Sequence, residues 1–306
     1  MGIAPVRRRQ SAFAAGLATL AMALGFTAIP ADAAPPPDVD YVALGDSYTA
    51  GTGAGPFAQT FPCDQTTGGY VDILNDSPIV TLVDNEACHG ALLTQATWDG
   101  VTSVQDQLAA LVDSGALSED TELVSLTAGA NDLGFANIIG ICATQSPTAC
   151  ENAVNTATSE ESLLALTEAL AETYTAIQAA APDATIVVFG YPLLFDTTDP
   201  VVPLPIPLAS QELINLGTLA INGAIEEAVD LANNEYDTSV VYVDVTKRFA
   251  GHEVNSTDPW IFFGTYLDAN GMPQLDPRSF HPNRDGHRAY ASALLSSVKL
   301  GLLVRP

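Results

Sequence analysis

The sequence predicts a three-layer α/β/α domain built on a five-stranded parallel sheet. Short runs of Val, Ile and Leu alternate along the chain with segments of helical periodicity. Strands that are apolar throughout are buried on both faces, which is typical of parallel sheets covered by helices. The polar residues with potential chemistry follow such strands directly, at the edge where open α/β sheets bind ligands.

The five predicted strands are short apolar runs: Asp40–Leu44, Ile79–Val83, Glu122–Thr127, Thr185–Phe189 and Ser239–Val245. The four predicted helices are Ser103–Val112, Ser159–Ala181, Ser210–Asn233 and Asp285–Leu302. The helix over 159–181 is the clearest, because its large apolar residues recur at steps of three and four and line one face.

Two stretches do not fit this alternation. Asn137–Thr158 carries a pair of cysteines and few large apolar residues, and Leu193–Ala209 has four prolines among apolar residues. A long apolar loop on such a scaffold either lines a pocket or packs on the surface, and the sequence leaves both alternatives open.

The N-terminal segment predicts a secretory signal peptide over residues 1–33. Arg7, Arg8 and Arg9 precede a nearly apolar run, and Ala31-Asp32-Ala33 places small residues at the cleavage positions. A membrane anchor is the weaker alternative, because the run is rich in Ala and Gly and only marginally long enough to span. We therefore expect a secreted, extracellular protein with no membrane anchor and one domain over residues 34–306. About 270 residues are enough for one α/β core.

The charge balance is strongly acidic. The chain has 36 acidic and 10 basic residues, for a net charge of −26. Such a field repels nucleic acids and anionic membranes, which excludes DNA and RNA as partners. We expect a monomer that binds no nucleic acid.

The four cysteines, Cys63, Cys88, Cys142 and Cys150, form an even set. In an exported protein an even number indicates two disulfides, with three possible pairings. We favour the pairing that is local in sequence, Cys63–Cys88 and Cys142–Cys150. No C-x-x-C pair occurs, which disfavours a zinc or redox site.

Three familiar catalytic or binding motifs are missing. The sequence has no G-x-S-x-G nucleophile elbow and no phosphate-binding G-x-x-x-x-G-K-[ST] loop. His252-Glu253 is followed by Ser256, where an H-E-x-x-H zinc helix would have its second histidine.

Three short motifs remain, and each is weak alone. Ser47 follows the first predicted strand, where it could be a nucleophile or merely a helix N-cap. Asn131 follows another strand and could donate to an oxyanion or form an Asx-turn. His281 precedes Pro282, which restricts its backbone to an extended conformation. Together these motifs indicate a site for acyl transfer.

In four blocks the chain resembles the SGNH or GDSL-type hydrolases. The blocks are 45–51 (G-D-S-Y-T-A-G), Gly90 within 87–91 (A-C-H-G-A), 129–132 (G-A-N-D) and 281–283 (H-P-N), in the family's order. The resemblance implies the SGNH hydrolase fold, a flavodoxin-like sheet with strand order 2-1-3-4-5. It also implies that Ser47 is the nucleophile and His281 the general base, with an oxyanion hole made by the Ser47 amide, the Gly90 amide and the Asn131 side chain.

One position departs from the family. Arg278 stands where the family often has an Asp, three residues before the histidine. We therefore expect a backbone carbonyl, that of Arg278, to orient His281, with the Asp276 carboxylate as the alternative. Asp46 and Asp132 are expected to be structural carboxylates that bond local amides.

The expected reaction is hydrolysis of a carboxylic ester through an acyl-serine, with no metal or organic cofactor. The remaining histidines, His89, His252 and His287, match no catalytic position. An apolar loop at 193–209 and the aromatic residues Trp260, Phe262 and Phe263 favour an acyl-lipid or short- to medium-chain ester. The alternatives are a carbohydrate acetyl esterase and a non-catalytic secreted binding module on the same fold.

Overall fold

The computed structural model describes residues 38–56, 62–95 and 100–304, all of which belong to one compact unit. The predicted signal peptide over 1–33 lies outside the described residues. The division of the chain at residue 34 therefore stays a prediction.

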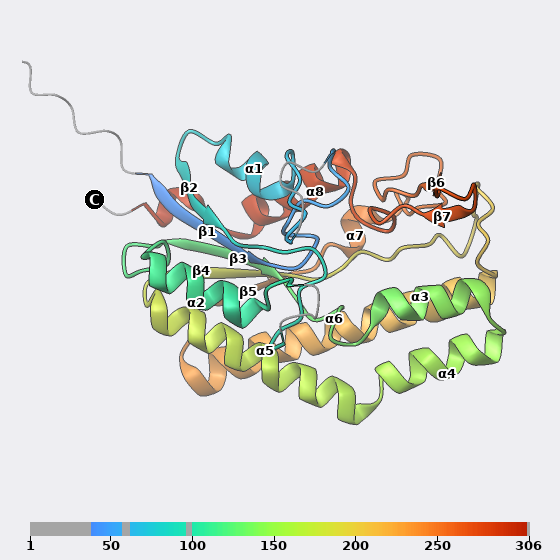
Figure 1. Ribbon diagram of the computed structural model, residues 1–306. Helices are drawn as coiled ribbons and strands as arrows, with labels where there is room; N and C mark the ends of the chain where they lie inside the picture. The colour runs from blue at the N-terminus through green and yellow to red at the C-terminus, as the bar shows by residue number, and fades with distance from the viewer. Residues whose placement is uncertain (1–37, 57–61, 96–99, 305–306) are drawn as a thin grey trace, which may run out of the picture. The chain divides into compact units, whose positions relative to one another are not determined.

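The central sheet has five parallel strands in the order β2-β1-β3-β4-β5 (Figure 1). They are β1 (Val39–Gly45), β2 (Val80–Asn85), β3 (Leu123–Thr127), β4 (Thr185–Phe189) and β5 (Val240–Val243). The predicted fold class and strand order are confirmed. In the register of β1 and β3, Gly45 pairs with Thr127, so the segments that follow these two strands leave the sheet side by side.

Helices cover both faces of this sheet (Figure 1). One face carries α1 (Tyr70–Asn75), α7 (Thr246–Phe249) and α8 (Arg284–Ser297), with a final 3₁₀ turn at Leu300–Leu302. The other face carries α2 (Val104–Ser114), α5 (Glu160–Ala180) and α6 (Leu208–Tyr236). The three central strands β1, β3 and β4 are almost entirely buried, as expected for a sheet covered on both sides, whereas the edge strands β2 and β5 are partly exposed. None of the described helices combines the length and hydropathy needed to cross a bilayer.

The stretch at 137–158, which does not fit the alternation predicted from the sequence, is largely helical. It forms α3 (Phe135–Thr144) and α4 (Pro147–Ala157), which pack beside α6. The Ser146 side chain accepts a hydrogen bond from the Ala149 amide, and Pro147 occupies the first helical turn. Serine at the N-cap and proline at N1 form a start signal that the weak apolar periodicity concealed.

Both cysteine pairs lie at disulfide distance in the predicted pairing. Cys142 of α3 is joined to Cys150 of α4, and Cys63 is joined to Cys88 directly after β2. The first bond fixes the angle of the α3–α4 pair. The second anchors the loop that carries the second motif block.

Candidate active site

Ser47 lies just beyond the carboxyl end of β1, where the chain turns sharply. The turn begins at Gly45, where φ is +129° and a Cβ atom would collide with the Thr127 carbonyl oxygen. The Asp46 amide donates to that same carbonyl at 2.9 Å, and the Tyr48 amide donates to the Asp46 carboxylate at 3.0 Å. Glycine is needed for this close approach and positive φ. The turn holds Ser47 at the sheet edge with only 5% of its surface exposed.

His281 meets Ser47 across this edge. The distance between His281 Nε2 and Ser47 Oγ is 2.7 Å. The histidine segment pairs with the segment at 260–262: the Phe262 amide donates to the His281 carbonyl, and the Phe280 amide to the Phe262 carbonyl, both at 2.7 Å. Side chains 234 positions apart in sequence are therefore brought together by backbone hydrogen bonds on both sides of the contact.

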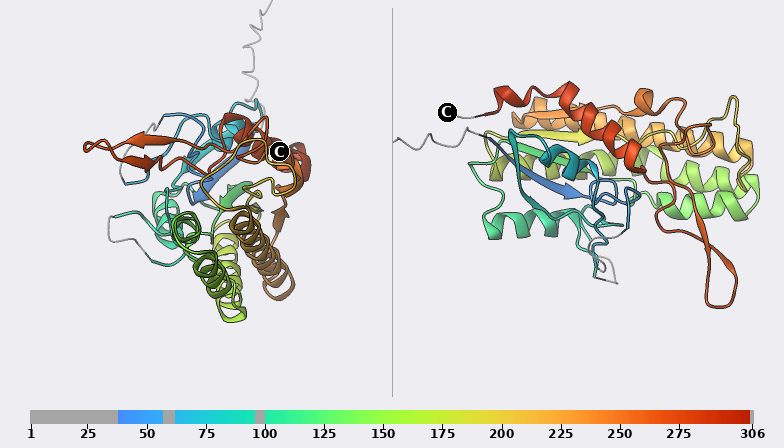
Figure 2. Two further views of the ribbon diagram at one scale, coloured as in Figure 1. Left: turned by 90° about the vertical axis from the view of Figure 1, so that its right-hand side faces the viewer. Right: turned by 90° about the horizontal axis from the view of Figure 1, so that it is seen from above.

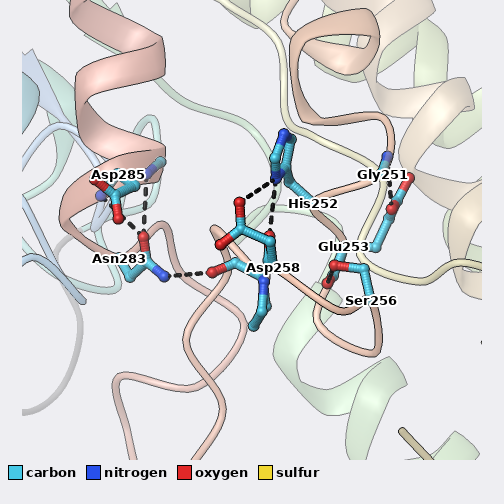
Figure 3. Close-up of polar contacts among 9 residues, drawn as sticks. Gly251, His252, Glu253, Ser256, Asp258, Asn283 and Asp285 are labelled. Carbon is cyan, nitrogen blue, oxygen red and sulfur yellow. Dashed lines mark hydrogen bonds and ion pairs between the residues drawn. The ribbon is translucent and has the colours of Figure 1, made fainter. Parts of the chain in front are cut away.

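The N-terminus of α8 fixes the other end of the histidine segment. The Asn283 side chain accepts hydrogen bonds from the Asp285 and Gly286 amides, as an N-cap does. The Asn283 side-chain nitrogen donates to the carbonyl of Pro259 at 2.7 Å, in the loop that also carries Asp258 (Figure 3). This residue thus joins helix α8 to the loop that supports His281.

The other ring nitrogen of His281 faces backbone carbonyls. Nδ1 lies 3.1 Å from the Ser279 carbonyl oxygen and 3.3 Å from that of Arg278. The predicted Arg278 carbonyl is within reach, but the Ser279 carbonyl is nearer. Asp276 instead forms a two-point ion pair with the Arg278 guanidinium, at 2.7 and 3.0 Å. Since a carbonyl can only accept, these contacts place the proton on Nδ1 and leave the Nε2 lone pair toward Ser47.

Phe280 adopts a conformation that sequence propensity does not favour. Its φ is +65°, a region that costs a bulky residue energy. The buried Tyr48 hydroxyl donates to the Phe280 carbonyl at 2.8 Å. That bond, together with the pairing to Phe262, holds the kink that turns the Ser279 carbonyl toward the imidazole.

The surroundings keep the imidazole of His281 neutral. Withdrawal from water lowers its pKa to about 3, and the neighbouring His89 ring adds to the effect. The carbonyls of Ser279 and Arg278 oppose it only partly. A neutral imidazole in contact with a serine hydroxyl is suited to accept the hydroxyl proton.

Three hydrogen-bond donors converge beside Ser47. Among the described residues, the amides of Ser47 and Gly90 donate to no partner. Gly90 has a φ of +80°, in the left-handed region that glycine adopts readily. Asn131 Nδ2 donates to the Ala91 carbonyl at 2.9 Å with one of its two hydrogens, so the other is free. Such a cluster can stabilise a developing oxyanion.

A cavity of about 300 Å³ opens beside these groups. Ser47, Gly90, Asn131 and His281 lie in its wall. The rest of the wall is largely apolar, with Phe135, Ala136 and Ile139 from α3, Leu194, and Ile221 from α6. An apolar cavity with a few convergent polar groups is the usual form of a site for a small organic ligand.

The sequence profile of the GDSL-like Lipase/Acylhydrolase family matches residues 43–289. The chain belongs to this family. Lipase 2 of Streptomyces coelicolor is 32% identical over an alignment of 318 positions that covers 96% of this chain and 98% of that protein. A lipase of Streptomyces rimosus is 32% identical over 297 residues, or 95% of this chain and 98% of that protein.

Solved structures agree with the assignment. The extracellular lipase of Streptomyces rimosus superposes with a TM-score of 0.68 and 28% identity, over 85% of this chain and all of that one (100%). Phospholipase A1 of Streptomyces albidoflavus NA297 superposes with a TM-score of 0.67 and 29% identity, over 84% of this chain and 98% of that one. This GDSL-type protein is therefore an ester-hydrolysing enzyme.

In this GDSL hydrolase the two motif aspartates hold the site together. Asp46 is buried and accepts hydrogen bonds from Thr127 at 2.6 Å and Tyr191 at 2.5 Å as well as from the local Tyr48 amide. Burial raises its pKa to about 6. Asp132 accepts from the amide of Leu93 at 3.0 Å, a partner distant in sequence, and also from its own amide, the kind of local contact we expected.

Two of the other histidines are structural. His287 is fully buried between the Thr52 carbonyl and the Tyr70 amide, and burial lowers its pKa to about 4. His252 stacks on Trp260 with ring centroids 3.5 Å apart and lies against Asp258 (Figure 3).

His89 differs from these two. Its ring centroid lies 5.2 Å from that of His281, and the side chain lines the cavity. The sequence interpretation placed it outside the site, although its position directly before Gly90 was a usable signal.

Most of the residues expected to favour an acyl chain do not line the cavity. Of the described residues in 193–209, Leu194 alone lines the cavity. Trp260 stacks on His252, and Phe262 lies under the Arg278 guanidinium, so neither reaches it. Phe263 packs on Phe280 behind the site. The apolar wall comes instead from α3, which the sequence interpretation left without secondary structure.

Proposed function

We propose that this protein is a secreted serine lipase that cleaves acyl esters, with Ser47 as nucleophile and His281 as general base. The observation that carries the proposal is the 2.7 Å contact between His281 Nε2 and Ser47 Oγ at the mouth of an apolar cavity.

In the proposed first step Ser47 Oγ attacks the carbonyl carbon of the ester while its proton passes to His281 Nε2. Negative charge develops on the carbonyl oxygen. The Ser47 amide, the Gly90 amide and Asn131 Nδ2 stabilise this oxyanion by donating hydrogen bonds to it. One such donor is typically worth about 3–4 kcal/mol of barrier. The imidazolium then gives its proton to the leaving alcohol, and an acyl-serine remains.

In the second step water attacks the acyl-serine while His281 takes a proton from it. The bond between the acyl carbon and Ser47 Oγ then breaks, the imidazolium returns its proton to Ser47 Oγ, and the carboxylic acid leaves. Throughout both steps the Nδ1 proton stays bonded to the Ser279 and Arg278 carbonyls. These carbonyls select the tautomer, although they stabilise the imidazolium less than a buried carboxylate does.

The apolar wall supports a lipid substrate over a sugar acetate. An acetyl group does not need a cavity of about 300 Å³ lined by Phe135, Ile139 and Ile221. The names of the relatives, lipase and phospholipase A1, point to the same substrate class. Hydrolysis of p-nitrophenyl esters of graded chain length tests this choice, because an acetyl esterase would lose activity at once beyond the acetate.

Ser47→Ala tests the nucleophile. The variant should fold, lose ester hydrolysis by several orders of magnitude, and no longer react with a fluorophosphonate probe. Loss of a mere N-cap would cost about 1 kcal/mol of stability and leave turnover intact. A wild-type protein that fails to react with the probe would favour a non-catalytic binding module.

Two observations support the proposal that the protein is secreted. The cysteine pairs suit an oxidising compartment, and the Streptomyces rimosus relative is described as extracellular. N-terminal sequencing of protein from the culture medium should find Ala34 as the first residue.

A further inference from the structure

An antiparallel hairpin extends away from the sheet and helices next to the cavity. It consists of β6 (Thr265–Leu267) and β7 (Pro273–Leu275), and both views of Figure 2 show it as a projecting orange-red arm. Asp268 organises its turn, because its carboxylate accepts hydrogen bonds from the Asn270 and Met272 amides at 2.9 and 2.8 Å. The hairpin is thus ordered by its own contacts.

This hairpin exposes large apolar side chains to water. The exposed fractions are 49% for Tyr266, 68% for Leu267, 59% for Met272 and 48% for Leu275. Single exposed apolar residues need no explanation, but a group of them on one projecting element indicates an interaction surface. Leu267 and Leu275 share one face of the ribbon, and Tyr266 lies on the other, so each face carries exposed apolar surface.

The hairpin runs directly into the active site. Leu275, Asp276 and Pro277, at the end of β7 and just after it, line the cavity. Two residues further on, the Ser279 carbonyl faces His281 Nδ1. A partner that binds the hairpin would therefore also lie next to the cavity.

We propose that the β6–β7 hairpin docks the enzyme on the neutral or zwitterionic lipid–water interface that holds its substrate. The proposal rests on the proposed acyl-lipid hydrolysis. The net charge of −26 opposes docking on an anionic membrane. Asp268 is the only charged residue of 265–275, and it is engaged in the turn, so apolar burial drives the contact.

The test compares wild type with Leu267→Ser/Met272→Ser in flotation with phosphatidylcholine vesicles. Both side chains are exposed and lie outside the cavity wall, so the variant should fold. Binding should weaken by about ten-fold or more, because each side chain loses apolar burial in the lipid. The matched control is Leu295→Ser/Leu302→Ser, in α8 and in the final 3₁₀ turn, whose side chains are 49% and 79% exposed. The C-terminal end of the chain lies opposite the hairpin (Figure 1).

Activity provides the second readout. Hydrolysis of an emulsified long-chain ester should fall with vesicle binding, while kcat/KM for a water-soluble monomeric ester stays within about two-fold. Equal losses on both substrates, or unchanged vesicle binding, would overturn the proposal. So would a wild-type dimer that the variant dissociates, because a second copy would then be the occupant.

Ser47→Ala separates this proposal from the proposed function. It should bind phosphatidylcholine vesicles as the wild type does, although it hydrolyses nothing. Vesicle binding without any hydrolysis by wild type would contradict the proposed function alone. Hydrolysis of soluble esters without vesicle binding would contradict the docking proposal alone. Vesicles rich in phosphatidylserine should bind less protein at low salt than phosphatidylcholine vesicles do.

Discussion

Asp276→Asn distinguishes a carbonyl-oriented histidine from a catalytic triad. The Asp276 carboxylate accepts two hydrogen bonds from the Arg278 guanidinium and one from the Arg278 amide at 2.9 Å, and it makes none with His281 among the described residues. The side chains of this ion pair are 16% and 34% exposed, so removing it should cost about 1 kcal/mol or less. We expect kcat/KM to fall by about ten-fold or less, against about 10⁴-fold for loss of a triad carboxylate.

The assay is kcat/KM for a soluble p-nitrophenyl ester, measured with the thermal midpoint of each protein. A cost of 1 kcal/mol would shift Tm by about 2–4 °C in a chain of this size. Asp285→Asn is the matched control, because it removes the exposed ion pair with Arg288 without touching the segment at 276–281. A loss near 10⁴-fold in folded Asp276→Asn alone would refute the carbonyl assignment.

Three further predictions concern the same site. Tyr48→Phe leaves the buried Phe280 carbonyl unpaired, which should lower the free energy of unfolding by about 1–3 kcal/mol. We expect kcat to fall with KM unchanged, and a wild-type kcat would show that the hydroxyl does not position the histidine. The pKa of His281 is lowered to about 3 and its neutral form is the active one in the proposed mechanism, so kcat/KM should persist as pH falls below 6.5. An acidic limb of the pH profile centred near 6.5 would show that the pKa of His281 is not lowered. Ile139→Trp should fill the apolar wall and shift the preferred p-nitrophenyl ester to shorter chains, and an unchanged chain-length profile would place the acyl group elsewhere.

The convergence of the motif residues could be predicted because strand ends are readable in the sequence. Ser47 and Asn131 each follow a buried strand, and β1 and β3 are neighbours, so their ends meet. The identity of the carbonyl beside His281 could not be predicted in the same way. It depends on a φ of +65° at Phe280, which local propensity opposes and which contacts to Tyr48 and Phe262 impose.

The apolar wall was missed for a different reason. Helix α3 has Asn, Gly and Thr among its apolar residues, so its periodicity is weak. A disulfide and packing against α6 stabilise it more than its own sequence does. Tertiary contacts of this kind override local preference and are not visible in a single sequence.

Ser279 contacts both the base of the hairpin and His281, the proposed general base. At the base of the hairpin the Ser279 hydroxyl donates to the Gly264 carbonyl and accepts from the Gly264 amide, both at 3.0 Å. The Ser279 carbonyl accepts a hydrogen bond from His281 Nδ1. Gly264 and the imidazole of His281 are therefore connected through the hydrogen bonds of Ser279. If lipid contact alters the proton affinity of His281 by some factor, protonation of His281 must alter lipid affinity by the same factor, because the two equilibria are thermodynamically linked.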